Sequence, residues 1–135
     1  MPRYWVKRLD EVPLVPTDDP TDFDWYPLQH YFGLSAFGIN AFGGDEGTVL
    51  AEEHVETNSG QEEVYIVLRG TARFTIDGDE VEVRPLGLVV IPDPGVRRGA
   101  VSAEGGTVLL ALGRRPGEFT SSWNPGNFEK VPRAG

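Results

Sequence analysis

One short stretch of the chain gathers the side chains with the most chemical potential, a histidine among acidic residues. Glu52, His54 and Glu56 occupy alternate positions, and Glu63 follows after a loop at 57–60. Alternate residues of an extended strand share a face, so the first three should point the same way. If the next strand pairs across the loop, the imidazole of His54 and the carboxylates of Glu56 and Glu63 converge. Such a group offers ligands that a divalent metal accepts.

The elements that must position these residues are typical of short strands. Glycine and proline are frequent, 17 and 11 of 135 residues, and they separate short apolar runs rich in β-branched and aromatic residues. Roughly eight strands with regularly spaced turns predict one all-β domain, a sandwich or closed barrel. Asp77, Gly78 and Asp79 indicate a hairpin turn. The predicted strands are 34–42, 48–55, 64–68, 71–76, 81–84, 88–91, 96–102 and 107–112.

The first 33 residues differ from the rest because they combine apolar side chains with four prolines between residues 13 and 27. The apolar side chains predict packing, whereas the prolines exclude a central strand. We expect an extended arm over 1–33, lying on the barrel or on a partner subunit, a barrel over 34–113 and a tail over 114–135. Short helical turns are expected within 18–31 and in the tail. Trp25, Tyr26 and Trp123 either anchor the arm or cap the barrel ends.

Composition narrows the classes of function. The net charge of −9 disfavours a nucleic acid or an anionic membrane as partner. The chain has no cysteine, which excludes disulfides, thiolate catalysis and iron–sulfur clusters, and it has no apolar run of about 20 residues. Nucleophile-elbow, P-loop and dinucleotide-binding motifs are absent as well. We therefore expect a soluble cytoplasmic domain, because residues 1–16 also lack the apolar block of a signal peptide.

Two parts of the sequence resemble the motifs of the cupin family. Glu63 follows a histidine-bearing strand and precedes Gly70 by six intervening residues, like the first cupin motif, and the segment from Gly78 through Pro85 to Arg98 resembles the second. The chain also resembles a group of small actinobacterial single-domain, RmlC-like cupins of unassigned function. The resemblance covers residues 34–113. It implies a double-stranded β-helix, or jelly-roll barrel, often dimeric, with its site in the barrel mouth.

The resemblance also implies a metal site, and this chain departs from the usual ligands. Metal-binding cupins carry a His-x-His pair, a glutamate and a later histidine. In this chain, His54 and Glu56 occupy the positions of the His-x-His pair. Gln61 occupies a position where relatives of the subgroup carry another histidine, and Arg98 occupies the position of the last histidine. Only Glu63 keeps the usual residue type and spacing.

Electrostatics suggests what replaces the missing ligands. Two carboxylates about 5 Å apart repel by roughly 3 kcal/mol at an effective dielectric of about 20. A metal, a shared proton or an arginine can relieve this repulsion. We predict that Arg98 does so through contacts with Glu63 and Glu56 beside His54, with Arg97 pointing outward because neighbours in a strand alternate.

Two functions remain. In the first, the barrel is a module that binds a small polar or anionic molecule and has a degenerate metal site. In the alternative, it is a metal-dependent oxygenase, isomerase or lyase, with Fe, Mn, Ni or Zn held by His54, Glu56 and Glu63. A homodimer is expected, without nucleic-acid or membrane partners. The candidate ligand-binding residues are His54, Glu56, Gln61, Glu63, Arg98 and Asn40, of which Asn40 could equally be a satisfied core amide.

Overall fold

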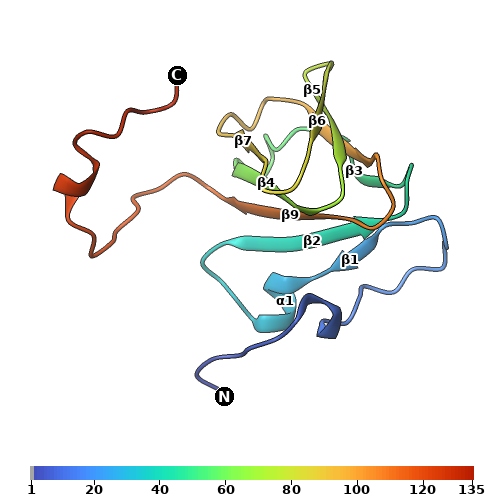
Figure 1. Cartoon of the computed structure of the whole chain (residues 1–135). Coiled ribbons are helices and arrows are strands. Elements are labelled where there is room, and N and C mark those ends of the chain that lie inside the picture. Colours follow the sequence, from blue (N-terminus) through green and yellow to red (C-terminus); the bar gives the residue numbers. More distant parts are fainter. Residues whose placement is uncertain (1) are drawn as a thin grey trace.

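The computed structural model describes residues 2–135 and shows two antiparallel sheets packed face to face (Figure 1). The five-stranded sheet has the order β1-β2-β9-β4-β7, and the four-stranded sheet has the order β3-β8-β5-β6. The predicted all-β jelly-roll class is therefore confirmed. The strands are β1 (Asp24–Tyr26), β2 (Gly38–Gly44), β3 (Val49–His54), β4 (Glu62–Arg69), β5 (Ala72–Ile76), β6 (Asp79–Val83), β7 (Leu88–Ile91), β8 (Arg98–Ser102) and β9 (Thr107–Arg114).

The core lies between the two sheets and follows from strand alternation. In β4, Tyr65 and Val67 are buried, whereas their neighbours along the strand are less so. Their side chains pack with Phe74 of β5 and Leu109 of β9 in the main hydrophobic cluster. Glu63 shares the inward face of Tyr65 and Val67, so one carboxylate is carried into the barrel on a strand held by apolar packing.

The hairpin between β5 and β6 has the turn that the sequence predicts. Asp77 and Gly78 both adopt positive φ, 47° and 86°, and Ile76 pairs with Asp79 across them. Two central residues with positive φ match the twist of the flanking strands. Asp and Gly tolerate this conformation better than most residues, which explains the position of the turn.

The N-terminal segment differs in part from expectation. The short helix α1 (Leu28–Phe32) overlaps the expected helical turn, but β1 was not expected, and β2 begins at Gly38 instead of residue 34. β1 pairs only with β2, at the edge of the five-stranded sheet, a place that the surrounding prolines allow. Val12 and Leu28 pack against the outer face of this sheet in a second hydrophobic cluster.

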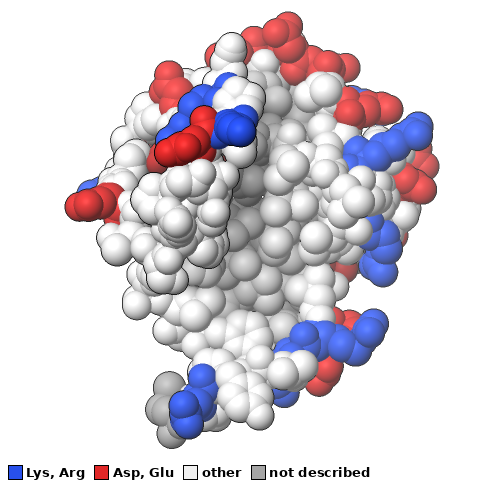
Figure 2. All heavy atoms as spheres, turned by 60° about the vertical axis from the view of Figure 1, so that its left-hand side comes forward, with Lys and Arg blue, Asp and Glu red and all other residues white. Residues whose placement is uncertain are grey.

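The C-terminal tail leaves the end of β9 and extends away from the barrel, with a short 3₁₀ helix at Pro125–Phe128 (Figure 1). Figure 2 shows the face of the molecule from which the tail leaves. On this face the charged side chains lie mostly around the margin, and a hollow lies between them. None of the helices among residues 2–135 has the length and apolar character needed to cross a membrane.

Candidate functional site

A cavity of about 510 Å³ opens between the two sheets and contains most of the predicted site residues. Its size is that of a typical small-molecule site. Apolar and aromatic side chains form part of its wall, among them Phe23, Phe42 and Leu50. The predicted residues that line it are Asn40, His54, Glu56, Gln61 and Glu63, and Arg98 is the one that does not.

Arg98 lies fully buried behind Glu63, at the first position of β8. Its Nη1 donates to Oε1 of Glu63 at 3.0 Å, and its Nε donates to the carbonyl oxygen of Val96 at 2.9 Å. Nη2 makes a longer contact of 3.4 Å with the carbonyl oxygen of Asp93. The predicted contact between Arg98 and Glu63 is therefore present, whereas residues 2–135 contain no ion pair between Arg98 and Glu56. Arg97 is exposed, as alternation predicts.

Tyr65 is the second donor to Glu63. Its hydroxyl group donates to the same Oε1 atom at 2.5 Å. Burial raises the pKa of Tyr65 far above its usual value, and the adjacent charge of Glu63 raises it further. The hydroxyl therefore stays protonated and remains a donor. Glu63 is held by two donors at one oxygen, so its other oxygen is the one that remains for a ligand.

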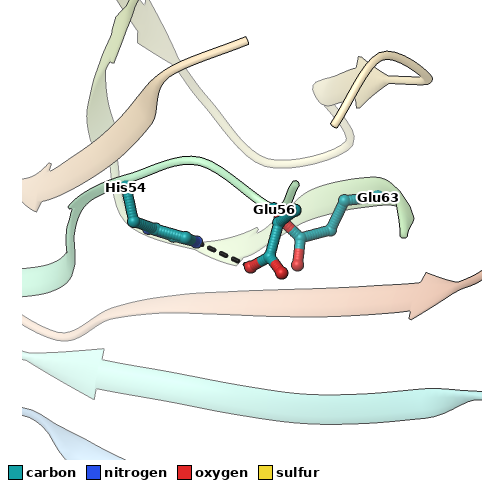
Figure 3. Close-up of side chains that lie close together, drawn as sticks. All are labelled: His54, Glu56 and Glu63. Carbon is teal, nitrogen blue, oxygen red and sulfur yellow. Dashed lines mark hydrogen bonds and ion pairs between the residues drawn. The ribbon is translucent and has the colours of Figure 1, made fainter. Parts of the chain in front are cut away.

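His54 and Glu56 form a second pair at the cavity wall (Figure 3). Nε2 of His54 lies 2.9 Å from Oε1 of Glu56, and Nδ1 lies 2.6 Å from the carbonyl oxygen of Glu52. The hydroxyl group of Ser59 donates to the other carboxylate oxygen of Glu56 at 2.5 Å. The loop between β3 and β4 thus folds back and fixes the carboxylate of Glu56 beside the ring.

The two ring nitrogens of His54 face two different acceptors. A carbonyl oxygen can only accept, so Nδ1 donates to the carbonyl oxygen of Glu52. Nε2 lies against Oε1 of Glu56 at 2.9 Å and joins the imidazole ring to this carboxylate. Glu63 has Arg98 as its cationic partner, so both carboxylates have a nitrogen partner within the protein.

A divalent metal can be tested against this arrangement. His54, Glu56 and Glu63 each offer one ligand atom, and these atoms lie within 4.8 Å of one another. The donor types and spacing suit a metal. However, both oxygens of Glu56 and one of Glu63 already have protein partners. A metal would also have to displace Glu56 from Nε2 of His54, and Arg98 adds a fixed positive charge beside Glu63. The network therefore competes with a metal for the same atoms.

Asn40 and Gln61 offer neutral polar groups to the cavity. Oδ1 of Asn40 accepts from the indole nitrogen of Trp25 at 2.9 Å, which leaves its amide nitrogen as a donor. The amide of Gln61 lies over Gly113, where a Cβ atom would collide with it. A side chain at residue 113 would therefore displace the amide of Gln61.

Two residues of the site were not singled out from the sequence. Ser59 lies in a loop, and nothing in its spacing signals a contact with Glu56. Tyr65 packs in the core, edge to face against Phe74 with ring centroids 5.4 Å apart. Its inward alternation with Glu63 was the available signal that its hydroxyl group also reaches the carboxylate.

Comparisons with known proteins give similarity in fold. No family model matches the chain, and no curated protein matches its sequence. A putative sugar phosphate isomerase from Acidithiobacillus ferrooxidans is similar, with 24% identity and a TM-score of 0.60 over 73% of this chain. This chain spans 63% of that protein, less than two thirds of its length.

Two further solved structures are matched over more of their length. A cupin protein from Bacteroides fragilis is 17% identical with a TM-score of 0.67, over 99% of this chain and 100% of that one. An RmlC-like cupin from Shewanella frigidimarina is 15% identical with a TM-score of 0.58, over 79% and 87%. The resemblance to an actinobacterial group stays a prediction. From its two-sheet topology and these similarities, the chain has the jelly-roll fold of the RmlC-like cupins.

Proposed function

We propose that the barrel binds a small polar molecule that carries hydroxyl groups, with the Arg98–Glu63 and Glu56–His54 pairs in place of a metal. The observation that carries this proposal is the cavity wall. It combines carboxylates and side-chain amides with aromatic rings, and none of the described residues that line it is lysine or arginine. Carboxylate oxygens accept hydrogen bonds from hydroxyl groups, whereas they repel an anion.

The polar groups are also held in place, which favours binding. Glu56 is fixed by His54 and Ser59, and Glu63 is fixed by Tyr65 and Arg98, so little side-chain freedom is lost when a ligand binds. Phe23 and Phe42 provide apolar surface on the same cavity. A sugar-sized molecule has both polar and apolar surfaces, and one protein of similar fold carries the description of a putative sugar phosphate isomerase.

A ligand screen tests this proposal. Neutral monosaccharides and polyols are added to the full chain, and the melting temperature and the heat of binding are measured. A ligand that binds the native state raises the melting temperature with its concentration. We expect at least one such ligand to bind saturably, and to bind less well to Gln61→Ala and Asn40→Ala than to Glu80→Gln, a substitution on exposed β6 outside the cavity. Equal binding to all three variants, or no binding by any of these compounds, contradicts the proposal.

A metal-dependent enzyme is the second candidate, and the grouping of His54, Glu56 and Glu63 favours it. These residues would hold Fe, Mn, Ni or Zn, and the metal would supply Lewis-acid or redox chemistry in the cavity. Addition of these metals separates the two functions. The second predicts a saturable rise in melting temperature that His54→Ala abolishes, whereas the first predicts no such rise.

We also propose a homodimer, built on the outer face of β4 and β7. β7 is an edge strand, and its outward side chains Leu88 and Val90 are 60% and 61% exposed, with Leu68 of β4 nearby in the same sheet at 48%. An exposed apolar strand edge favours association with another chain. Sedimentation at micromolar concentration should give twice the monomer mass of 14.8 kDa. Val90→Glu should dissociate the dimer, while Val81→Glu on the edge strand of the other sheet should not.

A further inference from the structure

A second hollow, of about 530 Å³, adjoins the cavity and differs from it in charge. The two share Gly38, Gln61 and Gly113 in their walls. The second hollow is lined by Arg114 and Arg115 together with serine and glutamine side chains, and by no acidic residue. In a chain with a net charge of −9, this hollow is a local concentration of positive charge beside a cavity lined by carboxylates.

Arg115 is oriented for a ligand by the loop that also holds Glu56. Its Nε donates to the carbonyl oxygen of Ser59 at 2.7 Å, while the hydroxyl group of Ser59 contacts Glu56. The two terminal nitrogens of the guanidinium group remain as donors. Throughout residues 2–135, neither Arg114 nor Arg115 takes part in an ion pair. A planar fork with free donors is suited to an oxyanion.

Gln61 stands at the boundary between the two hollows. Its amide rests over Gly113 and forms no side-chain hydrogen bond with any other part of the described chain. It can therefore contact a molecule that extends from one hollow into the other. A single ligand could place a neutral, hydroxyl-bearing part in the cavity and a charged part outside it.

We infer that the second hollow is a subsite for a phosphate monoester, and that the ligand of the barrel carries this group beside Arg115 and Arg114. The inference rests on the proposed function, because it assigns the other end of the same ligand. Glu52 also lines the cavity and forms no ion pair among residues 2–135, so its carboxylate would repel a phosphate and direct that group to the arginines. Glu62 is a competing acid, since it pairs with Arg114 in the strand register and lines an adjoining hollow together with Arg114 and Arg115.

Inorganic phosphate is the probe for this subsite. It is titrated into the ¹⁵N-labelled full chain at constant ionic strength, and the backbone amide signals of 113–115 and Gln61 are followed, with acetate as the second probe. We expect saturable shifts with phosphate and weaker binding of acetate, because a dianion pairs with both guanidinium groups. Loss of one charge-assisted contact in Arg115→Gln should weaken binding about tenfold or more.

Three further variants sharpen the result. Arg114→Gln should also weaken phosphate binding, and Glu62→Gln should strengthen it by removing the competing carboxylate. Arg84→Gln, on an exposed arginine outside both hollows, should leave it unchanged. Acetate binding as tightly as phosphate overturns the assignment to phosphate. Phosphate shifts that do not saturate, or that persist in Arg115→Gln, overturn the subsite.

The outcome is separable from that of the proposed function. If a neutral sugar binds in the cavity but phosphate does not bind near Arg115, the subsite fails and the proposed function stands. If phosphate binds near Arg115 but no neutral hydroxylated compound enters the cavity, the subsite stands and the proposed function fails.

Discussion

Replacement of Arg98 by methionine tests how the cluster is held together. Methionine keeps an unbranched apolar stem, although it is shorter than arginine, and it removes the charge and the guanidinium donors. Arg98 has 0% side-chain exposure and Glu63 has 11%, so the remaining carboxylate stays largely out of water. At 3.0 Å and an effective dielectric of about 20, the lost attraction is roughly 5 kcal/mol before changes in solvation are counted. Loss of one partner of a buried pair typically costs about 3–5 kcal/mol of unfolding free energy.

Urea unfolding followed by circular dichroism at pH 7 measures this cost in a double-mutant cycle. Arg98→Met should lower the free energy of unfolding by about 3–5 kcal/mol. The double variant with Glu63→Gln should recover about 2 kcal/mol of that loss, because no unpaired carboxylate remains. Arg97→Met, on the exposed neighbour, should change stability by less than about 0.5 kcal/mol.

A small total stability could leave Arg98→Met unfolded, since a domain has only about 5–15 kcal/mol. Arg98→Lys then serves in its place, because it keeps the charge but cannot make all the contacts of the guanidinium group. A cost of less than about 1 kcal/mol for Arg98→Met, or an equal cost with and without the carboxylate of Glu63, would show that the buried pair does not stabilise the cluster.

Two other predictions concern Tyr65 and the turn after β4. Burial raises the pKa of Tyr65 in the native state. The contribution of its protonated hydroxyl group to stability is therefore complete below the unfolded pKa of about 10, and above that pH the free energy of unfolding falls by about 1.4 kcal/mol per pH unit. Tyr65→Phe should therefore flatten the fall in stability between pH 10 and 11, and an equal slope in both proteins would contradict the burial of that hydroxyl. A Cβ atom at Gly70, where φ is +77°, would lie 2.6 Å from Cα of Thr107, whereas at Gly78, where φ is +86°, it would meet open space. Gly70→Ala should thus cost about 1–3 kcal/mol more than Gly78→Ala in urea unfolding, and equal costs would refute the close approach.

The strands were predictable because local signals and tertiary packing agree. β4 and β7 combine β-branched residues with alternation, and the turn at Asp77 and Gly78 has residues that tolerate positive φ. β1 was not predictable, since three residues carry too little pattern and its pairing depends on β2. The start of β2 was misjudged because the apolar residues Leu34 and Phe37 precede it, and both are exposed and lie outside the sheet.

The sequence predicted several residues of the cavity wall, but neither the contact of Ser59 nor the depth of Arg98. Alternation places His54, Glu56 and Glu63 on one side, and the cupin resemblance places Arg98 opposite them. Strand alternation does not predict that Arg98 lies behind Glu63 instead of in the cavity wall. This position depends on the contacts of Arg98 with the loop before β8. The contact of Ser59 with Glu56 depends on a loop conformation that no pattern in the sequence encodes.

We infer from the Arg98–Glu63 ion pair and the His54–Glu56 contact that the cluster is complete without a metal. Plasma mass spectrometry of tag-free protein prepared without chelators tests this inference, with the melting temperature measured before and after dialysis against EDTA. We expect far less than one transition-metal ion per chain and an unchanged melting temperature. One transition-metal ion per chain, released by Glu63→Gln, would show instead that the cluster is a metal site.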